Sequence, residues 1–323
     1  MKNRQVNILI IEAKFFSVND ELKKIVQDTV KEAVITVVPQ KDVTDEMMSE
    51  AEIIFGWPSH DGLKKAKNLK MVTLPSAGVD GYTDKNLYLN KDILLTNSSG
   101  VYGLPIAEHV FAMILSYNRN LQEYACLKKE KTWNNTLKTR DFNGSTVGII
   151  GFGDIGKEVA IRAKAWGARV LAVKRKPSEK PDYVDHLYLT EEMDEVLKQS
   201  DYVVLSLPST EKTKGIISRE RINRMKPDAF LVNVGRGNLV DQEALIEALK
   251  ENRIGGAGLD VMTPEPLPAD SPLWELPNVI ITQHSSGSSA GNDIRRIKIF
   301  ADNVRRYLNG EDLMNVVDFS EGY

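Results

Sequence analysis

The sequence predicts an α/β fold with two domains, each built on a doubly wound parallel sheet. Three observations support this prediction. The chain has 323 residues, which exceeds the roughly 250–300 residues at which a single hydrophobic core stops growing. Short apolar runs rich in β-branched residues alternate with helical patterns, which is typical of parallel sheets covered by helices. The alternation begins at the N-terminus and starts again at residue 146, where a strand runs into a glycine-rich motif.

The composition is that of a globular protein, with 42% hydrophobic and 27% charged residues. A net charge of −3 with interspersed signs predicts neither nucleic acid nor an anionic membrane as a partner. No apolar run approaches the roughly 20 residues of a membrane span. Cys126 is the single cysteine, which excludes an internal disulfide and a thiolate cluster, and no metal site is expected. Glu12 and Lys14 interrupt the first apolar run, so we expect a cytoplasmic protein without a signal peptide.

The first hundred residues contain the strands of one sheet. Five runs are predicted to form it: Val6–Ile11, Val34–Val38, Ile53–Phe55, Met71–Leu74 and Ile93–Thr96. A helix capped near Asn19 is predicted between the first two, with apolar positions at helical spacing from Leu22 to Val30. This half has no glycine-rich motif, so it is expected to be an α/β domain without its own cofactor loop.

A long helical pattern follows, with Pro105 in its first turn and apolar positions continuing to Leu121. Six further runs then predict a complete second sheet: Val147–Ile150, Arg169–Val173, Tyr202–Leu205, Phe230–Val234, Ala257–Leu259 and Val279–Thr282. The intervening helices are predicted over 157–166, 191–199, 219–225 and 242–251. The last helical pattern, over 293–308, has no strand left to follow, so we expect it to return to the first domain.

The motif Gly151-Phe-Gly153-Asp-Ile-Gly156 stands directly after an apolar strand and before a helix. This G-x-G-x-x-G order is typical of a dinucleotide site, because the pyrophosphate binds at the helix N-terminus, where free N–H groups and the helix dipole favour an anion. The same letters also fit the start of a nucleoside-triphosphate P-loop. Glu158 stands where that loop needs Ser or Thr for magnesium, which counts against the alternative.

The second strand of this domain ends in Lys174-Arg175-Lys176. An NAD site usually has Asp or Glu there to accept hydrogen bonds from the ribose 2′-hydroxyl. Cations in that place favour a 2′-phosphate, so the sequence predicts NADP in preference to NAD, with NAD kept as an alternative. A basic loop exposed to solvent would give the same pattern.

Three later strands end in polar residues suited to catalysis, namely Arg236, Glu265 and His284. Ligands of such sheets bind at the carboxyl ends of the strands, so these side chains are candidates for one site. Arg236 could bind a substrate carboxylate with two hydrogen bonds and polarise the adjacent carbonyl. His284 could exchange the proton of the carbonyl oxygen, and Glu265 would favour its charged form. His109, within the Pro105 helix, is expected to be structural.

The chain resembles the D-isomer-specific 2-hydroxyacid dehydrogenases over essentially its whole length. The resemblance rests on the Gly151 loop and on these segments: Ser76-Ala-Gly-Val-Asp80, Pro105-Ile-Ala-Glu-His109, Asn233-Val-Gly-Arg-Gly237, Gly258-Leu-Asp-Val261, Glu265-Pro-Leu-Pro, and His284 with Gly287. It implies two Rossmann-like domains, with a dinucleotide-binding domain (101–286) inserted in a flavodoxin-like substrate domain (1–100 and 287–323). A homodimer is the usual assembly of the family.

The resemblance also implies roles for individual residues. Arg236, Glu265 and His284 form the catalytic group, and the backbone amides of Ala77, Gly78 and Val79 bind the substrate carboxylate. The implied cofactor site comprises Gly151, Gly153, Asp154, Ile155, Gly156, Lys174, Arg175, Pro208, Thr213 and Asp260, with Asp260 on the nicotinamide carboxamide. Ser206 replaces a common histidine, a change also found in members that prefer NADP.

The predicted reaction is hydride transfer between NADP(H) and a small 2-keto acid or D-2-hydroxy acid. Two alternatives remain: a formate dehydrogenase, whose pattern has Gln in place of Glu265, and a nucleotide-sensing binding protein like the C-terminal-binding corepressors. The sequence does not select the keto acid. Trp57, His60 and Tyr102 are candidates for the substrate side-chain end of the site, and ordinary packing explains each equally well.

Overall fold

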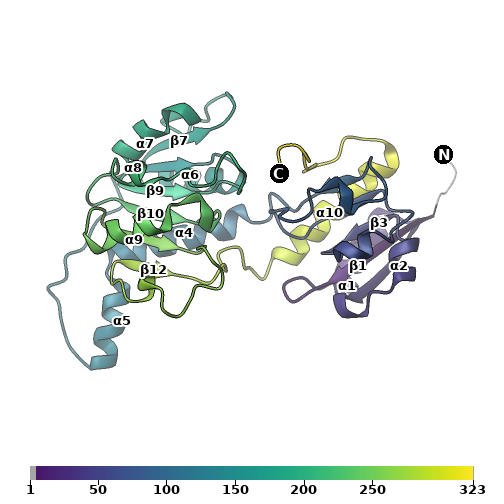
Figure 1. Ribbon diagram of the computed structural model, residues 1–323, viewed down its shortest axis with the longest axis horizontal. Helices are drawn as coiled ribbons and strands as arrows, with labels where there is room; N and C mark the ends of the chain where they lie inside the picture. The colour runs from purple at the N-terminus through teal and green to yellow at the C-terminus, as the bar shows by residue number, and fades with distance from the viewer. Residues whose placement is uncertain (1–4, 323) are drawn as a thin grey trace. The chain divides into compact units, whose positions relative to one another are not determined.

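The computed structural model describes residues 5–322. The chain divides into two compact units, and Figure 1 shows both. The first unit contains the residues up to Tyr102 and those from Ser289 onward, and the second contains Gly103–Ser288. These boundaries lie two residues beyond the positions expected from the sequence.

The first unit is built on a five-stranded parallel sheet with the order β2-β1-β3-β4-β5, which is the flavodoxin-like order. Its strands are β1 (Val6–Glu12), β2 (Ala33–Pro39), β3 (Ile53–Phe55), β4 (Met71–Thr73) and β5 (Leu94–Thr96). All five were predicted, because a sheet buried on both faces requires nearly continuous apolar runs, and β3 and β4 are buried at every position.

The helices of the first unit are α1 (Asp20–Thr29), α2 (Asp45–Glu50), α3 (His60–Leu63) and α10 (Asn292–Asn309). Asn19 caps α1 by accepting from the Leu22 amide at 2.9 Å. As expected, α10 returns to this unit, where it packs beside α1 and stacks Phe300 on Phe55 of β3. His60, one of the candidates for the substrate side-chain end of the site, begins α3. That helix is too short to leave a periodic pattern in the sequence.

The second unit is built on a seven-stranded parallel sheet with the order β12-β11-β10-β9-β6-β7-β8. Its strands are β6 (Thr146–Ile150), β7 (Arg169–Lys174), β8 (His186–Leu189), β9 (Tyr202–Leu205), β10 (Phe230–Asn233), β11 (Gly256–Leu259) and β12 (Val279–Ile281). The prediction of six strands missed β8. That strand lies at the sheet edge and is only half-buried, so it has no continuous apolar run.

The helices of the second unit are α4 (Gly103–Asn118), α5 (Leu121–Glu130), α6 (Asp154–Ala165), α7 (Met193–Gln199), α8 (Arg219–Ile222) and α9 (Gln242–Lys250). The helical pattern predicted to run through Leu121 is broken earlier, since Asn120 has a left-handed backbone (φ 53°) that ends α4 and starts α5. None of the α5 residues is buried. Figure 1 shows α5 and the chain after it extending away from the sheet of this unit.

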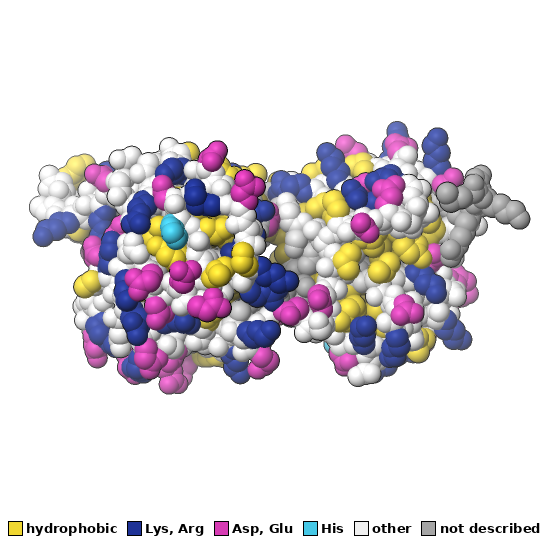
Figure 2. All heavy atoms as spheres, turned by 90° about the horizontal axis from the view of Figure 1, so that it is seen from above, with side chains coloured by type: hydrophobic (Ala, Val, Ile, Leu, Met, Phe, Trp, Pro, Cys, Tyr) yellow, Lys and Arg dark blue, Asp and Glu magenta, His cyan; other side chains and the backbone are white. Residues whose placement is uncertain are grey.

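The surface carries mixed charge. Figure 2 shows Lys and Arg side chains interspersed with Asp and Glu over the face drawn, in line with the charge pattern of the sequence. Among the helices within residues 5–322, none combines the length and the apolar character that crossing a membrane requires.

Candidate active site

The glycine-rich loop begins where β6 ends, at the point where the strand order of the second sheet reverses. Gly151 has a left-handed backbone (φ 105°), and a Cβ there would lie 2.8 Å from the Ser206 carbonyl oxygen. Gly153 precedes α6, and nothing lies within 4 Å of the position that its Cβ would take. The N-terminus of α6 therefore faces open space in which the backbone can approach a phosphate, so this loop fits a dinucleotide pyrophosphate.

The first turn of α6 contains the other loop residues predicted to bind cofactor. Asp154 is exposed, and one of its carboxylate oxygens accepts from the Gly103 amide at 3.0 Å, which ties the start of α6 to the start of α4. Ile155 is half-buried. Gly156 is buried, and a Cβ there would lie 2.3 Å from the Gly151 carbonyl oxygen, so a larger residue would separate the helix from the loop.

The basic segment, residues 174–176, lies beside the glycine loop. The Val173 carbonyl accepts from the amides of Gly151 and Phe152 at 3.2 and 3.1 Å, so the end of β7 is bound directly to the loop. Lys174 is the last residue of β7 and donates to Ser178 Oγ at 3.1 Å. Arg175 and the following Lys176 are exposed. Positive charge thus lies at the strand end where the ribose 2′-substituent of a dinucleotide is recognised.

The loop after β9 contains the remaining residues predicted to bind cofactor from this side. Ser206 donates to the Gly151 carbonyl at 2.8 Å and so holds the glycine loop from the neighbouring strand. Thr213 donates to the Pro208 carbonyl at 2.7 Å and accepts from the Thr210 amide at 2.8 Å. The threonine hydroxyl therefore closes this loop and fixes the backbone around Pro208.

Arg236 follows β10, between two glycines that pack against neighbouring backbone. A Cβ on Gly237 would lie 2.0 Å from the Met262 carbonyl oxygen, so only glycine allows the loop to approach the segment after β11. Asn233 braces the turn, because its side chain donates to the Arg236 carbonyl at 2.9 Å and accepts from the Gly235 amide at 3.1 Å. The half-buried guanidinium donates to the Gly235 carbonyl at 2.8 Å.

His284 and Glu265 form a direct pair. His284 Nδ1 lies 2.8 Å from Glu265 Oε2, and the other carboxylate oxygen of Glu265 accepts from the Met262 amide at 3.1 Å. The pair is partly open to solvent, with 51% of the histidine and 35% of the glutamate side chain exposed. The contact with the carboxylate occupies Nδ1 and orients the ring.

Asp260, at the end of β11, holds the segment that carries His284. Its carboxylate is fully buried and accepts from Thr282 Oγ1 at 2.5 Å and from the amides of Ser285 and Ser286 at 2.9 and 3.0 Å. Its carbonyl accepts from the His284 amide at 2.8 Å. Burial raises the pKa of Asp260, but the hydrogen bonds from Ser286, Thr282 and the two amides lower it more, so the pKa lies below its ordinary value.

These contacts stabilise an unusual backbone at His284, whose φ of 49° lies in the left-handed region. The supporting residues Thr282, Ser285 and Ser286 were not identified from the sequence. Their only signal was their position after a strand end. His109 Nε2 lies 2.9 Å from Thr282 Oγ1, so the helix α4 histidine extends the same network.

The candidate carboxylate-binding loop lies in the first unit, after β4. Each of its carbonyl groups has a donor within the unit. The Ser76 carbonyl accepts from the Ser98 amide, the Ala77 carbonyl from Asn97 Nδ2 and the Gly78 carbonyl from Ser76 Oγ, at 2.7–2.9 Å. Within residues 5–322, the amides of Ala77, Gly78 and Val79 have no acceptor. A row of N–H groups without protein acceptors is a site suited to an anion.

Two aromatic residues considered as substrate contacts brace this unit from within. Trp57 is half-buried and donates to Ser76 Oγ at 3.3 Å. The Tyr102 hydroxyl donates to the Pro75 carbonyl. Among the residues that the structure describes, no three His, Cys, Asp or Glu side chains gather as a metal site would require.

The similarity of the chain to known proteins shows which family it belongs to. The sequence model for the D-isomer specific 2-hydroxyacid dehydrogenase NAD binding domain matches residues 111–286, which is more than half of the chain. The chain belongs to the D-isomer-specific 2-hydroxyacid dehydrogenases. It is therefore an oxidoreductase of a family that uses a nicotinamide dinucleotide and acts on small hydroxy and keto acids.

Individual relatives agree with this assignment. The glyoxylate reductase of Korarchaeum cryptofilum is 36% identical over 261 residues, which are 78% of this chain and 77% of the relative. A family member of known structure from Aeromonas salmonicida is 32% identical, with a TM-score of 0.85 over 98% of this chain and all of the other. The NADPH-dependent glyoxylate/hydroxypyruvate reductase of Sinorhizobium meliloti, solved with NADP and sulfate, is 26% identical, with a TM-score of 0.82 over 98% and 100% of the chains.

Replacing Asp260 by Asn tests the buried carboxylate. An amide cannot accept from all three donors, so we expect the free energy of unfolding at pH 7 to fall by about 2–3 kcal/mol. The stabilisation by a carboxylate with a lowered pKa is complete above the unfolded pKa of about 3.9 and disappears as the pH falls through the folded pKa. Urea unfolding between pH 3 and 7 should therefore show the gap between wild type and variant closing below about pH 4. The exposed Asp182→Asn is the control. A gap independent of pH would contradict this role.

Proposed function

We propose that the protein reduces small 2-keto acids with NADP(H) in preference to NAD(H), and that it acts in reverse as a D-2-hydroxyacid dehydrogenase. The observation that carries the proposal is the 2.8 Å pair of His284 and Glu265 at the carboxyl end of the second sheet. Arg236 lies in the loop after β10, the strand that pairs with β11. An imidazole, a carboxylate and a guanidinium at one sheet edge suit the reduction of a carbonyl next to a carboxylate.

His284 is the proposed proton donor and acceptor. During reduction, Nε2 gives its proton to the carbonyl oxygen of the keto acid, and during oxidation it removes the proton of the hydroxyl group. The Glu265 carboxylate, 2.8 Å from Nδ1, is proposed to orient the ring for this exchange. The strained backbone at His284, held by the hydrogen bonds of Asp260, sets the direction of the ring.

Arg236 and the loop after β4 are the proposed substrate-binding groups. A guanidinium can donate two parallel hydrogen bonds to the carboxylate and a further one to the carbonyl oxygen, where negative charge develops. The amides of Ala77, Gly78 and Val79 are proposed to bind the carboxylate. The name of the Korarchaeum cryptofilum relative, a glyoxylate reductase, supports a small substrate.

The cofactor site is proposed to comprise the glycine loop, Lys174, Arg175, Pro208 and Thr213. A bound nicotinamide supplies the hydride in the reduction and accepts it in the oxidation. Lys174 and Arg175 would pair with a 2′-phosphate, and the NADP complex of the Sinorhizobium meliloti relative supports this preference. The contact of Asp260 with the carboxamide stays a prediction, as does the cytoplasmic location.

The proposed role of His284 predicts that His284→Ala lowers kcat for 2-keto acid reduction by at least about a hundredfold, because general acid catalysis is lost. NADPH binding, followed by fluorescence titration, should be unchanged. His186→Ala, an exposed histidine on β8, is the matched control. The substrate panel comprises glyoxylate, hydroxypyruvate, pyruvate, phenylpyruvate and branched 2-keto acids. Near-normal turnover of His284→Ala would refute the assignment, and no turnover of wild type on the whole panel would favour a nucleotide-sensing protein.

The cofactor preference is tested by replacing Lys174 and Arg175 with Ala together. We expect the Kd for NADPH to rise about 10- to 100-fold, because charge-assisted hydrogen bonds to the phosphate are lost. The Kd for NADH should change less than about twofold, since NADH has no 2′-phosphate. Replacing Lys23 and Lys24 of α1 in the same way removes two cations elsewhere and controls for net charge. An equal loss of both cofactors would contradict the 2′-phosphate argument.

We also propose that the chain forms a homodimer through α5 and the segment that follows it. Apolar side chains there lie open to solvent, with Trp133 92% and Leu121 54% exposed, and a second copy could cover them. Trp133→Ser should therefore shift the mass measured by light scattering from twice that of the monomer toward one, whereas Trp274→Ser, at a residue that is also exposed, should not. A wild type that is monomeric at micromolar concentration would refute the proposal.

A further inference from the structure

The first unit contains a buried arginine, Arg296 of α10, that the proposed reaction has not used. Its side chain is only 7% exposed. A buried guanidinium is expensive unless its donors are satisfied, and here they are. Nε lies 3.0 Å from the Pro75 carbonyl oxygen and 2.9 Å from the Tyr102 hydroxyl, Nη1 donates to the Phe15 carbonyl at 2.8 Å, and Nη2 donates to Tyr102 at 2.8 Å.

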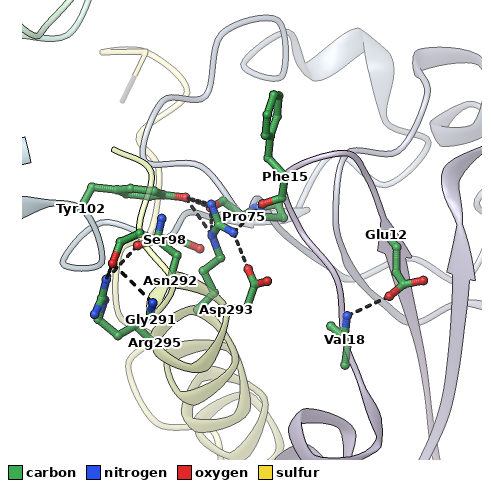
Figure 3. Close-up of polar contacts among 12 residues, drawn as sticks. Glu12, Phe15, Val18, Pro75, Ser98, Tyr102, Gly291, Asn292, Asp293 and Arg295 are labelled. Atoms are coloured by element: carbon green, nitrogen blue, oxygen red, sulfur yellow. Dashed lines mark hydrogen bonds and ion pairs between the residues drawn. The ribbon is translucent and has the colours of Figure 1, made fainter. Parts of the chain in front are cut away.

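One carboxylate compensates the charge of this arginine. Asp293, one helical turn earlier, accepts from Nη1 of Arg296 at 2.5 Å and is 30% exposed. The guanidinium of Arg296 thus binds Tyr102, Pro75, Phe15 and Asp293, four residues that are labelled in Figure 3. Arg296 therefore joins helix α10 to the segments that follow β1, β4 and β5.

The Pro75 carbonyl matters because it belongs to the loop proposed to bind the substrate carboxylate. In a trans peptide, the carbonyl of one residue and the amide of the next share one plane and point in opposite directions. A donor that fixes a carbonyl therefore fixes the following N–H group. The Ser98 amide donates to the Ser76 carbonyl and in this way fixes the Ala77 amide. The Asn97 side chain donates to the Ala77 carbonyl and so fixes the Gly78 amide.

Two peptide planes of this loop remain, Pro75–Ser76 and Gly78–Val79. Arg296 and Tyr102 hold the Pro75 carbonyl, which fixes the Pro75–Ser76 plane and with it the backbone that carries the Ser76 side chain. Ser76 Oγ in turn donates to the Gly78 carbonyl at 2.7 Å, which fixes the Val79 amide. A continuous path of hydrogen bonds and planar peptides thus runs from the arginine to the row of amides.

We infer that Arg296 is a positioning residue for the substrate carboxylate: through Pro75 and Ser76 it orients the Val79 amide of the loop after β4, without touching the substrate. The inference rests on the proposed function of that loop. It predicts that loss of Arg296 lowers the activity with substrates that have a carboxylate and leaves the activity with uncharged analogues unchanged. A residue that only stabilises the fold would affect both kinds of substrate equally.

The test compares Arg296→Met with Arg295→Met. Arg295 is the neighbouring cation on α10, and its side chain donates to Ser289 and Asn292. The two variants lose the same charge from the same helix, and only the first loses the donors to Pro75 and Tyr102. For each variant, kcat and KM are measured with NADPH for the best 2-keto acid of the panel and for its methyl ester, and the Kd for NADPH is titrated separately.

For Arg296→Met we expect kcat/KM for the keto acid to fall about 10- to 100-fold, mainly through KM, because a binding group misplaced by about 1 Å loses this much. Activity with the ester and the Kd for NADPH should match those of Arg295→Met. If Arg296→Met does not fold, Arg296→Lys serves instead. It keeps the cation but loses the fork of donors, and the same selective loss is expected, reduced in size.

An equal loss with acid and ester, or no difference between the Arg296 and Arg295 variants, would overturn the inference while leaving the proposed function intact. Absence of turnover by the wild type on every 2-keto acid would contradict the proposed function itself, and with it the inference.

Discussion

The arrangement of the candidate active site depends on the buried carboxylate of Asp260. Three strands of the second sheet end side by side, but proximity alone does not orient the side chains beyond their ends. Asp260 gathers one hydroxyl and two amides of the segment after β12 around a single charge, and its own carbonyl binds the His284 amide. A buried anion without these donors would be strongly unfavourable, so these hydrogen bonds hold the segment in this position.

A similar principle operates in the first unit with the charges reversed. There a buried cation and several neutral donors hold the carbonyl groups of the loop after β4, and the amides of Ala77, Gly78 and Val79 have no acceptor among residues 5–322. In both units a buried charge supports a segment that has no regular secondary structure. Loops can carry chemistry only where something replaces the ladder of hydrogen bonds that a helix or strand would provide.

Much of this architecture could be predicted from the sequence, because buried parallel strands require apolar runs and the glycine loop has fixed spacing. The catalytic candidates were found by their position after strand ends. The features that escaped prediction leave no local pattern in the sequence. The edge strand β8 is only half-buried, and the helix α3 has only four residues. The bracing by Arg296 joins residues more than 190 positions apart, which no local period reveals.

The hydrogen bond from Trp57 to Ser76 gives the loop after β4 an optical reporter. The chain has four tryptophans, and the other three, Trp133, Trp166 and Trp274, have 44–92% of their surface exposed. The indole of Trp57 is half-buried and bonded to the serine that braces the row of amides, so its emission depends on the polarity and hydrogen bonding of that loop. Fluorescence of the unmodified protein thus carries a signal from the loop itself, beside the emission of three more exposed rings.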